Sequence, residues 1–210
     1  MKITVFGASG KVGRIVVDLL QADNHDLTLF IHTHNPFTEN NNLKIVHGDI
    51  NSSKDIDLAL NNSDLVISTL GSWGTKNKNV LSTSMNQIIP ALKRNNIKRI
   101  ISLTGADARC SADKSSLISS VSHLIFGILV RKILIDGEKH IKLLEDSGLD
   151  FTIIRSPVMT KGGQKNSYKL NLEYAKPWET IGRNNVAEAL VAQINETKYV
   201  QLSPFIHKKD

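Results

Sequence analysis

The chain is poor in cysteine, with only Cys110 among its 210 residues. One cysteine excludes an internal disulfide framework and a cysteine metal cage. No His, Asp or Glu residues recur at metal-ligand spacing, so no metal site is predicted. Cys110 has no basic pair or helix start beside it in the sequence, which favours an inert thiol.

The chain is also poor in aromatic residues, at 5%, and has no dense basic run despite a formal net charge of +6. Proteins that bind single-stranded nucleic acid interleave basic and aromatic side chains. Here the lysines and arginines are spread along the sequence, as solvated surface charge is. We expect no nucleic-acid partner, whereas a small anionic ligand is compatible with the charge.

The chain does not begin with a charged stretch followed by an apolar segment. We therefore expect no secretory signal and a cytoplasmic location. The apolar segment 117–135 is about as long as a membrane span, but it contains His123, Arg131 and Lys132. Its apolar residues recur at helical spacing, which indicates an amphipathic helix facing a core or a partner. We therefore expect no membrane partner, and either a monomer or a homodimer. The apolar positions are Val121, Leu124, Ile125, Ile128 and Leu129.

What the chain does have is a regular alternation of apolar strand-like and amphipathic helix-like segments. The strand-like segments are apolar on both faces, as in 65–67 and 100–101, which is typical of parallel strands covered by helices. The alternation predicts one compact α/β domain over 1–210, with a doubly wound parallel sheet and helices on both faces. We expect strands at 2–6, 27–32, 43–47, 64–69, 98–103, 150–155 and 198–202, and helices at 11–22, 52–61, 79–96, 118–147 with a break near Gly137, and 184–196.

Three glycines, Gly7, Gly10 and Gly13, follow the first predicted strand and open the first predicted helix. Strand, glycine turn and helix in this order favour a dinucleotide-binding loop over an ordinary strand-to-helix loop. Gly7 allows a tight turn, Gly10 lets the backbone approach a pyrophosphate, and Gly13 lets helix and strand pack closely. The phosphates are expected on free N–H groups at the positive end of the helix.

The second predicted strand ends at His32, Thr33 and His34, without the acidic residue that usually binds the ribose 2′-hydroxyl of NAD. Lys11 and Arg14 lie in the first loop. The absence of a carboxylate removes repulsion against a 2′-phosphate, so the sequence favours NADP over NAD. The histidines are equally compatible with ordinary loop residues.

Later strand ends add further candidate cofactor contacts. Asp49 and Ile50 suit an adenine pocket, in which Asp49 addresses the exocyclic amine. Leu70 and Gly71 follow the fourth strand, where small residues permit a close backbone approach. Pro157 ends the sixth strand and fixes the turn that follows.

Taken together, these segments resemble an atypical short-chain dehydrogenase/reductase of the NAD(P)H-binding, NmrA-like or biliverdin-reductase-B-like kind. The similarity covers the chain from Met1 to about residue 195. It is carried by 7–13 (GASGKVG), 48–50 (GDI), 64–71 (DLVISTLG), 98–102 (KRIIS), 147–157 (SGLDFTIIRSP) and 181–187 (IGRNNVA).

The resemblance implies a Rossmann-type domain that binds NADP or NAD, with a small substrate-side region at about 156–183. It places Pro157 and Val158 near the nicotinamide carboxamide, and it places the catalytic serine or threonine of the fifth strand at either Ser102 or Thr104. The implied cofactor contacts are Gly7, Ser9, Gly10, Val12, Gly13, His32, Asp49, Ile50, Leu70 and Gly71. Lys11 and Thr33 are added as the cation and hydroxyl next to a 2′-phosphate.

The chain departs from the family pattern at several positions. His32 stands where relatives usually have an arginine for the 2′-phosphate, and neutral histidine binds an anion more weakly. No tyrosine lies between Gly105 and Pro157, so the usual Tyr-x-x-x-Lys pair is missing. Tyr168 and Tyr174 come too late in the sequence to supply it. Asn185 replaces the Asp of a late R-x-D-V-A pattern, which we expect to remove a local structural contact.

The sequence thus predicts an NAD(P)H-dependent reductase of a small conjugated or carbonyl substrate, such as a quinone, flavin or ketone. Solvent can protonate such a product, and His140 or His123 is a candidate acid, although a packed structural role is favoured for His123. The alternative is a non-catalytic NAD(P)-binding regulator or redox sensor that binds a protein. An epimerase or isomerase ranks below both, because that chemistry also relies on the missing Tyr-Lys pair.

Overall fold

The computed structural model describes residues 1–73, 75–114 and 117–209. Its main sheet has the order β3-β2-β1-β4-β5-β6-β10-β8, with β1 to β6 parallel and β8 antiparallel to β10. The chain therefore winds outward from β1 in one direction, and then from β4 in the other. The strands are β1 Lys2–Phe6, β2 Asp26–Ile31, β3 Leu43–His47, β4 Leu65–Ser68, β5 Arg99–Gly105, β6 Asp150–Ser156, β8 Tyr168–Asn171 and β10 Phe205–Lys208.

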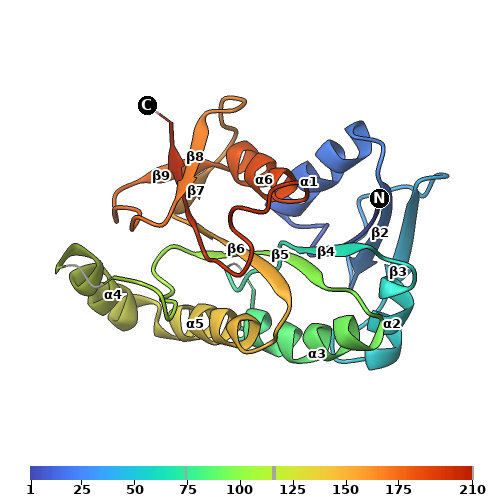
Figure 1. Cartoon of the computed structure of the whole chain (residues 1–210), viewed down its shortest axis with the longest axis horizontal. Coiled ribbons are helices and arrows are strands. Elements are labelled where there is room, and N and C mark those ends of the chain that lie inside the picture. The colour runs from blue at the N-terminus through green and yellow to red at the C-terminus, as the bar shows by residue number, and fades with distance from the viewer. Residues whose placement is uncertain (74, 115–116, 210) are drawn as a thin grey trace.

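Helices cover both faces of this sheet (Figure 1). Helices α1 (Lys11–Ala22) and α6 (Arg183–Ala192) lie side by side on one face, and α2 (Ser53–Leu60), α3 (Val80–Arg94) and α5 (Arg131–Glu145) lie on the other. Helix α4 (Leu117–Leu129) lies beside α5 at one end of the molecule. The prediction of a doubly wound α/β fold is confirmed.

The strands are buried because both of their faces are covered. All four residues of β4 and residues Ile3 to Phe6 of β1 are buried. Successive side chains of a strand point to opposite faces, so Ile67 packs in the core under α1 and α6, whereas Val66 packs in the core under α2, α3 and α5. Two hydrophobic cores thus hold the sheet from both sides.

The predicted break in the helix 118–147 was placed wrongly. The break lies at Val130, between α4 and α5, and Gly137 lies inside α5. Glycine at 137 allows α5 to approach β5: a Cβ there would lie 2.9 Å from Ala108 Cβ and 3.0 Å from Thr104 Oγ1. The glycine signals a close helix–sheet contact and not a helix end.

The predicted strand at 198–202 was also wrong. Residues 198–201 form a turn, and the left-handed backbone of Gln201, with φ of 60°, is incompatible with a regular strand. The strand that joins the sheet is β10, directly after Pro204. Helix α6 ends at Ala192, short of the predicted residue 196.

The region 156–183, expected on the substrate side, contains short strands that the sequence did not indicate. Strands β7 (Val158–Thr160) and β9 (Thr180–Gly182) pair in parallel as a separate small sheet, and β8 adds to the edge of the main sheet. No helix among the described residues is long and apolar enough to cross a membrane.

Candidate functional site

The sheet changes winding direction between β1 and β4, which are neighbours in the sheet. In doubly wound folds, ligands bind outside the carboxyl ends of the strands at this switch point. The glycine loop 7–13 leaves β1 here, and residues 69–71 leave β4 beside it. Thr69 joins the two, because its hydroxyl donates to Gly7 O at 3.0 Å. The fold brings these two predicted cofactor segments together.

Two of the three glycines are required by the geometry of the loop. Gly7 has a φ of 78°, and a Cβ there would lie 2.8 Å from Leu70 N. A Cβ at Gly13 would lie 2.2 Å from Gly7 O, so the first turn of α1 packs directly on the loop. The turn is closed by the Gly10 N–H, which donates to Gly7 O at 3.0 Å. These contacts match the roles predicted for Gly7 and Gly13.

The N-terminus of α1 is arranged to receive an anion. Gly10 is the N-cap and offers no side chain to the first-turn amides, and the first turn contains no acidic residue. The first hydrogen bond of the helix is Arg14 N–H to Gly10 O. The N–H groups of Lys11, Val12 and Gly13 therefore lack intrahelical partners, as at any helix start. Free amides and the helix dipole favour a phosphate at this position, and the residues present fit a dinucleotide.

Arg14 of α1 holds the glycine loop. Ser9 is half-buried, and its carbonyl accepts from Arg14 Nε at 3.0 Å. The guanidinium of Arg14 therefore stabilises the glycine loop directly.

The other predicted cofactor residues near this helix end differ in exposure. Lys11 is exposed and Val12 is buried. After β4, Leu70 is half-buried and Gly71 is exposed.

The ends of β2 and β3 present a mixed electrostatic surface. His32, Thr33 and Asp49 are exposed, and Ile50 is half-buried. The Asp49 carboxylate accepts from the backbone and side-chain N–H groups of Asn51, both at 2.9 Å. The backbone bond from Asn51 lowers the pKa of Asp49, and the nearby charge of His32 adds to that effect. Asp49 is therefore an anion close to His32.

The two candidate catalytic residues of β5 are buried to different extents. Ser102 is fully buried, and its hydroxyl lies 2.9 Å from His140 Nε2 of α5. Thr104 lies two residues nearer the carboxyl end of the strand. Its hydroxyl is also buried, but it has no hydrogen-bond partner among the described residues. Of the two hydroxyls, that of Thr104 is the one left without a protein partner in the described part of the chain.

Strand β6 ends beside β5 at the same edge of the sheet. Pro157 is buried, whereas Val158 is exposed at the start of β7. Ser156 lies beside Gly105, the last residue of β5. Pro157 and Val158 are therefore on the sheet edge that carries Thr104. Their contact with a nicotinamide ring stays a prediction.

Neither candidate histidine offers an exposed acid at this edge. Complete burial lowers the pKa of His140 to about 4, and the negative charge of Asp136 only partly opposes this effect. His140 is therefore neutral at physiological pH. His123 lies on α4, where its Nε2 is 2.6 Å from Glu138 Oε1 of α5. This pairing is consistent with a structural role for His123.

Sequence reasoning missed a buried carboxylate that organises the loop after β4. Asp136 of α5 is fully buried and accepts from the N–H groups of Leu81 and Ser82 at 3.0 and 2.9 Å. The hydroxyls of Ser72 and Ser82 donate to it at 2.5 and 2.6 Å. An acidic residue in the apolar stripe of a helix was the available signal. Asp136 ties α5 to the start of α3 and to Ser72 in the loop after β4.

Sequence reasoning also missed Tyr174, which the fold returns to the end of β5. Its hydroxyl donates to Asp107 Oδ1 at 2.5 Å, and the Ser122 hydroxyl of α4 donates to the same oxygen at 2.7 Å. Burial raises the pKa of Tyr174, and the hydrogen bond to Asp107 raises it further. The phenol is therefore a weak acid whose proton is already engaged, unlike the missing Tyr-x-x-x-Lys tyrosine.

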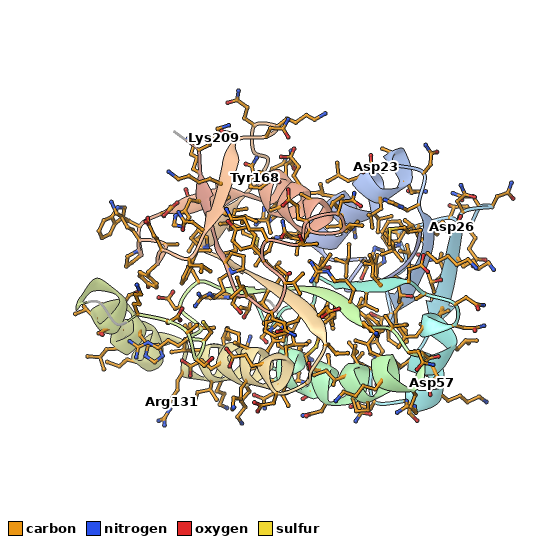
Figure 2. The ribbon with its side chains drawn as sticks, in the orientation of Figure 1. Asp23, Asp26, Asp57, Arg131, Tyr168 and Lys209 are labelled. Carbon is orange, nitrogen blue, oxygen red and sulfur yellow. The ribbon has the colours of Figure 1, made fainter. Side chains whose placement is uncertain are left out.

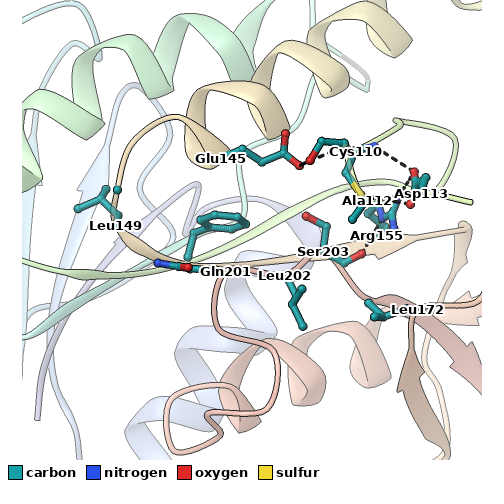
Figure 3. Close-up of a pocket in the computed structure, with 13 residues that line it drawn as sticks. Cys110, Ala112, Asp113, Glu145, Leu149, Arg155, Leu172, Gln201, Leu202 and Ser203 are labelled. Carbon is teal, nitrogen blue, oxygen red and sulfur yellow. Dashed lines mark hydrogen bonds and ion pairs between the residues drawn. The ribbon is translucent and has the colours of Figure 1, made fainter.

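A cavity of about 230 Å³ lies beyond β6, away from the glycine loop (Figure 3). Its charged groups all have protein partners: Arg155 Nη1 lies 2.6 Å from Asp113 Oδ2, and Glu145 accepts from the N–H and hydroxyl of Ser111. Cys110 donates to Asp113 at 3.2 Å, and burial raises the pKa of its thiol, consistent with an inert cysteine. The charged groups that line this cavity already bond to other protein groups, so the cavity is not part of the candidate site.

Two further sequence expectations can be placed in the structure. Asn185, which replaces the family's Asp, is buried and keeps a local contact: its Nδ2 donates to Gln164 O at 2.6 Å. A carboxylate could not donate this bond, so the loss of the contact that an Asp would make here stays a prediction. No group of three or more His, Cys, Asp or Glu side chains within the described part of the chain could hold a metal ion.

Comparison with known proteins identifies a family. The family model described as NAD(P)H-binding matches residues 7–197. A search of curated proteins finds no match.

Solved structures with the same fold cover nearly the whole chain at low identity. An oxidoreductase, ylbE, from Lactococcus lactis has a TM-score of 0.82 at 19% identity, with 100% of this chain and 92% of that chain covered. A short-chain dehydrogenase/reductase from Veillonella parvula, solved in complex with NADP, has a TM-score of 0.78 at 20% identity, with 99% and 94% covered. ChuY, an anaerobillin reductase from Escherichia coli, has a TM-score of 0.76 at 19% identity, with 100% and 98% covered.

Proposed function

This chain belongs to the NAD(P)H-binding family, and we propose that it is an atypical short-chain dehydrogenase/reductase that reduces a small conjugated or carbonyl substrate. The observation that carries the proposal is the N-terminus of α1, which lies at the switch point of the sheet. Gly10 leaves the first-turn amides there uncapped, so they are free to bind an anion. Quinones, flavins and ketones are the substrate classes we propose. Two structural neighbours, one described as an oxidoreductase and the other as an anaerobillin reductase, support the proposal.

We propose a role for each residue of the site. The amides of Lys11, Val12 and Gly13 bind the pyrophosphate, and Asp49 with Ile50 flanks the adenine. When bound, NAD(P)H supplies a hydride from its nicotinamide ring. Pro157 and Val158 lie beside that ring in our proposal, and the unpartnered hydroxyl of Thr104 orients the substrate. Ser102 has a structural role in our proposal, because its hydroxyl lies 2.9 Å from His140 Nε2 and so joins β5 to α5.

The proton donor decides which substrates suit the site. His140 is buried and neutral, and the proton of Tyr174 is engaged by Asp107. A substrate whose reduced form takes its proton from water needs neither residue. We therefore favour conjugated acceptors such as quinones and flavins over simple ketones.

We propose that the protein prefers NADP to NAD. His32 and Thr33 at the exposed end of β2, with Lys11 of the glycine loop, would bind the 2′-phosphate. In a His32→Asp variant, the new carboxylate would repel a 2′-phosphate and accept from a ribose hydroxyl. We expect the ratio of NADPH to NADH affinity to fall at least about tenfold, measured by fluorescence titration. An unchanged ratio would remove His32 from the 2′-phosphate site.

The test of cofactor binding itself is a Gly10→Asp variant. Its extended backbone, with φ of −71° and ψ of 169°, suits an Asp N-cap, so the fold should be kept. The added carboxylate would occupy the first-turn amides and repel the pyrophosphate, and we expect NADPH binding to be lost. Gly10→Asn, which has a neutral side chain of the same shape, should bind more tightly than Gly10→Asp. Intact binding in Gly10→Asp would make the cofactor assignment wrong.

A non-catalytic redox sensor is the second candidate, favoured by the missing Tyr-Lys pair and the full burial of Ser102. Turnover separates the two functions. NADPH oxidation should be followed with flavins, quinones and aldehydes as acceptors. A Thr104→Val variant, which keeps the shape but removes the hydroxyl, should bind NADPH normally and turn over more slowly. Tight NADPH binding without turnover across the panel would favour the sensor.

A further inference from the structure

Helix α4 presents an apolar face that nothing in the described chain covers. Four side chains, Val121, Leu124, Ile125 and Ile128, are between 48% and 76% exposed. Their spacing of three and four residues places them on one side of the helix. We call these four residues the α4 face. Exposed aliphatic side chains that form a contiguous stripe mark an interaction surface.

Two polar residues of α4 face the body of the protein and fix the orientation of the helix. Ser122 is buried and donates to Asp107, and His123 pairs with Glu138 of α5. These two contacts anchor the helix to the body from its inner side. The α4 face is therefore held outward by specific bonds.

Positive charge adjoins the α4 face. Arg131 and Lys132 follow α4 directly and are exposed, whereas α4 itself contains no acidic residue. Figure 2 shows Arg131 reaching away from the body of the protein. An apolar helix face with adjacent cations is the pattern of helices that lie in the interface of an anionic membrane.

A second exposed segment lies at the same end of the molecule (Figure 1). The connection between β8 and β9 is linked to α4, because Tyr174 and Ser122 donate to the same oxygen of Asp107. This connection carries Trp178, which is 71% exposed, with Lys176 Nζ 6.0 Å from the centre of its ring. Tryptophan and lysine are typical anchors at a membrane–water interface.

We propose that the α4 face, with Trp178, Lys176, Arg131 and Lys132, docks this protein onto an anionic lipid surface without spanning it. A second copy of the chain fits less well. A 13-residue helix is about 20 Å long and 10 Å wide. It therefore offers roughly 200 Å², against about 800 Å² per partner in a stable interface. A partner α4 would also bring no acidic residue to Arg131 and Lys132.

The proposal is tested by sedimentation of the full chain with vesicles. We expect it to sediment with vesicles of phosphatidylglycerol and phosphatidylcholine, and much less with phosphatidylcholine alone. A Leu124→Ser/Ile128→Ser variant should lose at least about tenfold in vesicle affinity, because two aliphatic side chains no longer leave water. The matched control is Leu58→Ser, since Leu58 of α2 is 63% exposed at the opposite end of the molecule.

The charge contribution needs its own pair of variants. Arg131→Gln/Lys132→Gln should weaken binding to the anionic vesicles, whereas Lys54→Gln/Lys93→Gln, with the same net charge, should not. Failure of the wild-type chain to sediment with anionic vesicles would overturn the proposal, as would full binding by the Leu124→Ser/Ile128→Ser variant. Light scattering that shows a dimer, dissociated by Ile128→Ser, would assign the α4 face to a second copy instead.

This inference is independent of the proposed reductase function. Circular dichroism melting curves check that each variant is folded. NADPH titration of the same variants should give unchanged affinity, because none of the substituted residues lies in the glycine loop or at the strand ends proposed to bind the cofactor. Loss of vesicle binding with intact cofactor binding therefore reports on the α4 face alone.

Discussion

At the scale of single residues, His140 is a neutral imidazole enclosed beneath the proposed site. Its Nε2 lies 2.9 Å from the Ser102 hydroxyl, and the ring is fully buried on the inner side of α5. Burial lowers its pKa from 6.5 to about 4. The folded protein therefore holds this side chain uncharged at pH values where the unfolded chain would protonate it.

We expect this residue to make the protein sensitive to mild acid. Because the folded pKa is below the unfolded one, its contribution to stability is complete above about pH 6.5 and is lost as pH falls toward 4. The slope in that window is about 1.4 kcal/mol per pH unit, or about 3 kcal/mol in all. Urea unfolding at a series of pH values measures it.

The comparison for that experiment is a His140→Gln variant, which keeps a polar contact to Ser102 without titrating. Its free energy of unfolding should be lower at pH 7 and should vary less between pH 6.5 and 4. The exposed His34→Gln serves as control and should follow the wild-type curve. A His140→Gln curve parallel to that of the wild type would contradict the assignment.

At the scale of elements, α3 begins against a carboxylate supplied by another helix. Its N-cap residue, Asn79, makes no side-chain capping bond, and the amides of Leu81 and Ser82 donate to Asp136 of α5 instead. Negative charge at a helix N-terminus also interacts favourably with the helix dipole. Asp136 thus acts as the cap of α3 from a distance in sequence.

An Asp136→Ala variant should lose about 2–4 kcal/mol of stability, because it leaves four buried donors without their acceptor. The fall in the urea midpoint measures this loss. Asp146→Ala, at the exposed end of the same helix, should leave the midpoint nearly unchanged. Equal midpoints for the two variants would show that Asp136 does not cap α3.

The helices, strands and loops differ in how far the sequence could predict them. Apolar strands and the glycine loop were predictable, because their patterns depend on neighbours within a few residues. The break at Val130 was not, since Gly137 has the same local signature whether it ends a helix or packs against Thr104. Tyr174 and Asp136 reach their partners only through the tertiary fold, and no local pattern reports such contacts. The predicted cofactor segments that follow β1 and β4 do meet at one edge of the sheet, but their contacts with a ligand stay predictions.

At the scale of the whole molecule, Arg155 connects segments far apart in sequence. It is buried in β6, donates to Ser203 O at 2.8 Å and to Asp113 at 2.6 Å, and lies 3.7 Å from the centre of the Phe205 ring. The guanidinium thus links the turn after β5 to the segment that leads into β10. The segments at this end of the sheet are therefore held together by contacts with a single side chain.

We expect an Arg155→Met variant to lose about 3 kcal/mol of stability, because Asp113 keeps a charge without its partner. Amide hydrogen exchange should quicken over 201–208, since the contacts that hold this segment are gone. Arg94→Met, which breaks an ion pair exposed on the surface, should leave that exchange unchanged. Equal exchange in the two variants would show that Arg155 does not hold the C-terminal strand.

The position of β10 in the sheet also bears on synthesis at the ribosome. The amides of Ile153 and Arg155 on the outer edge of β6 donate to the carbonyls of Leu202 and Pro204. While the chain is being translated, β1 to β6 emerge before these acceptors exist. The nascent domain therefore passes through a stage with an open sheet edge, which is a template for pairing with other chains. A chaperone that shields this edge would matter most just before residues 202–208 leave the exit tunnel.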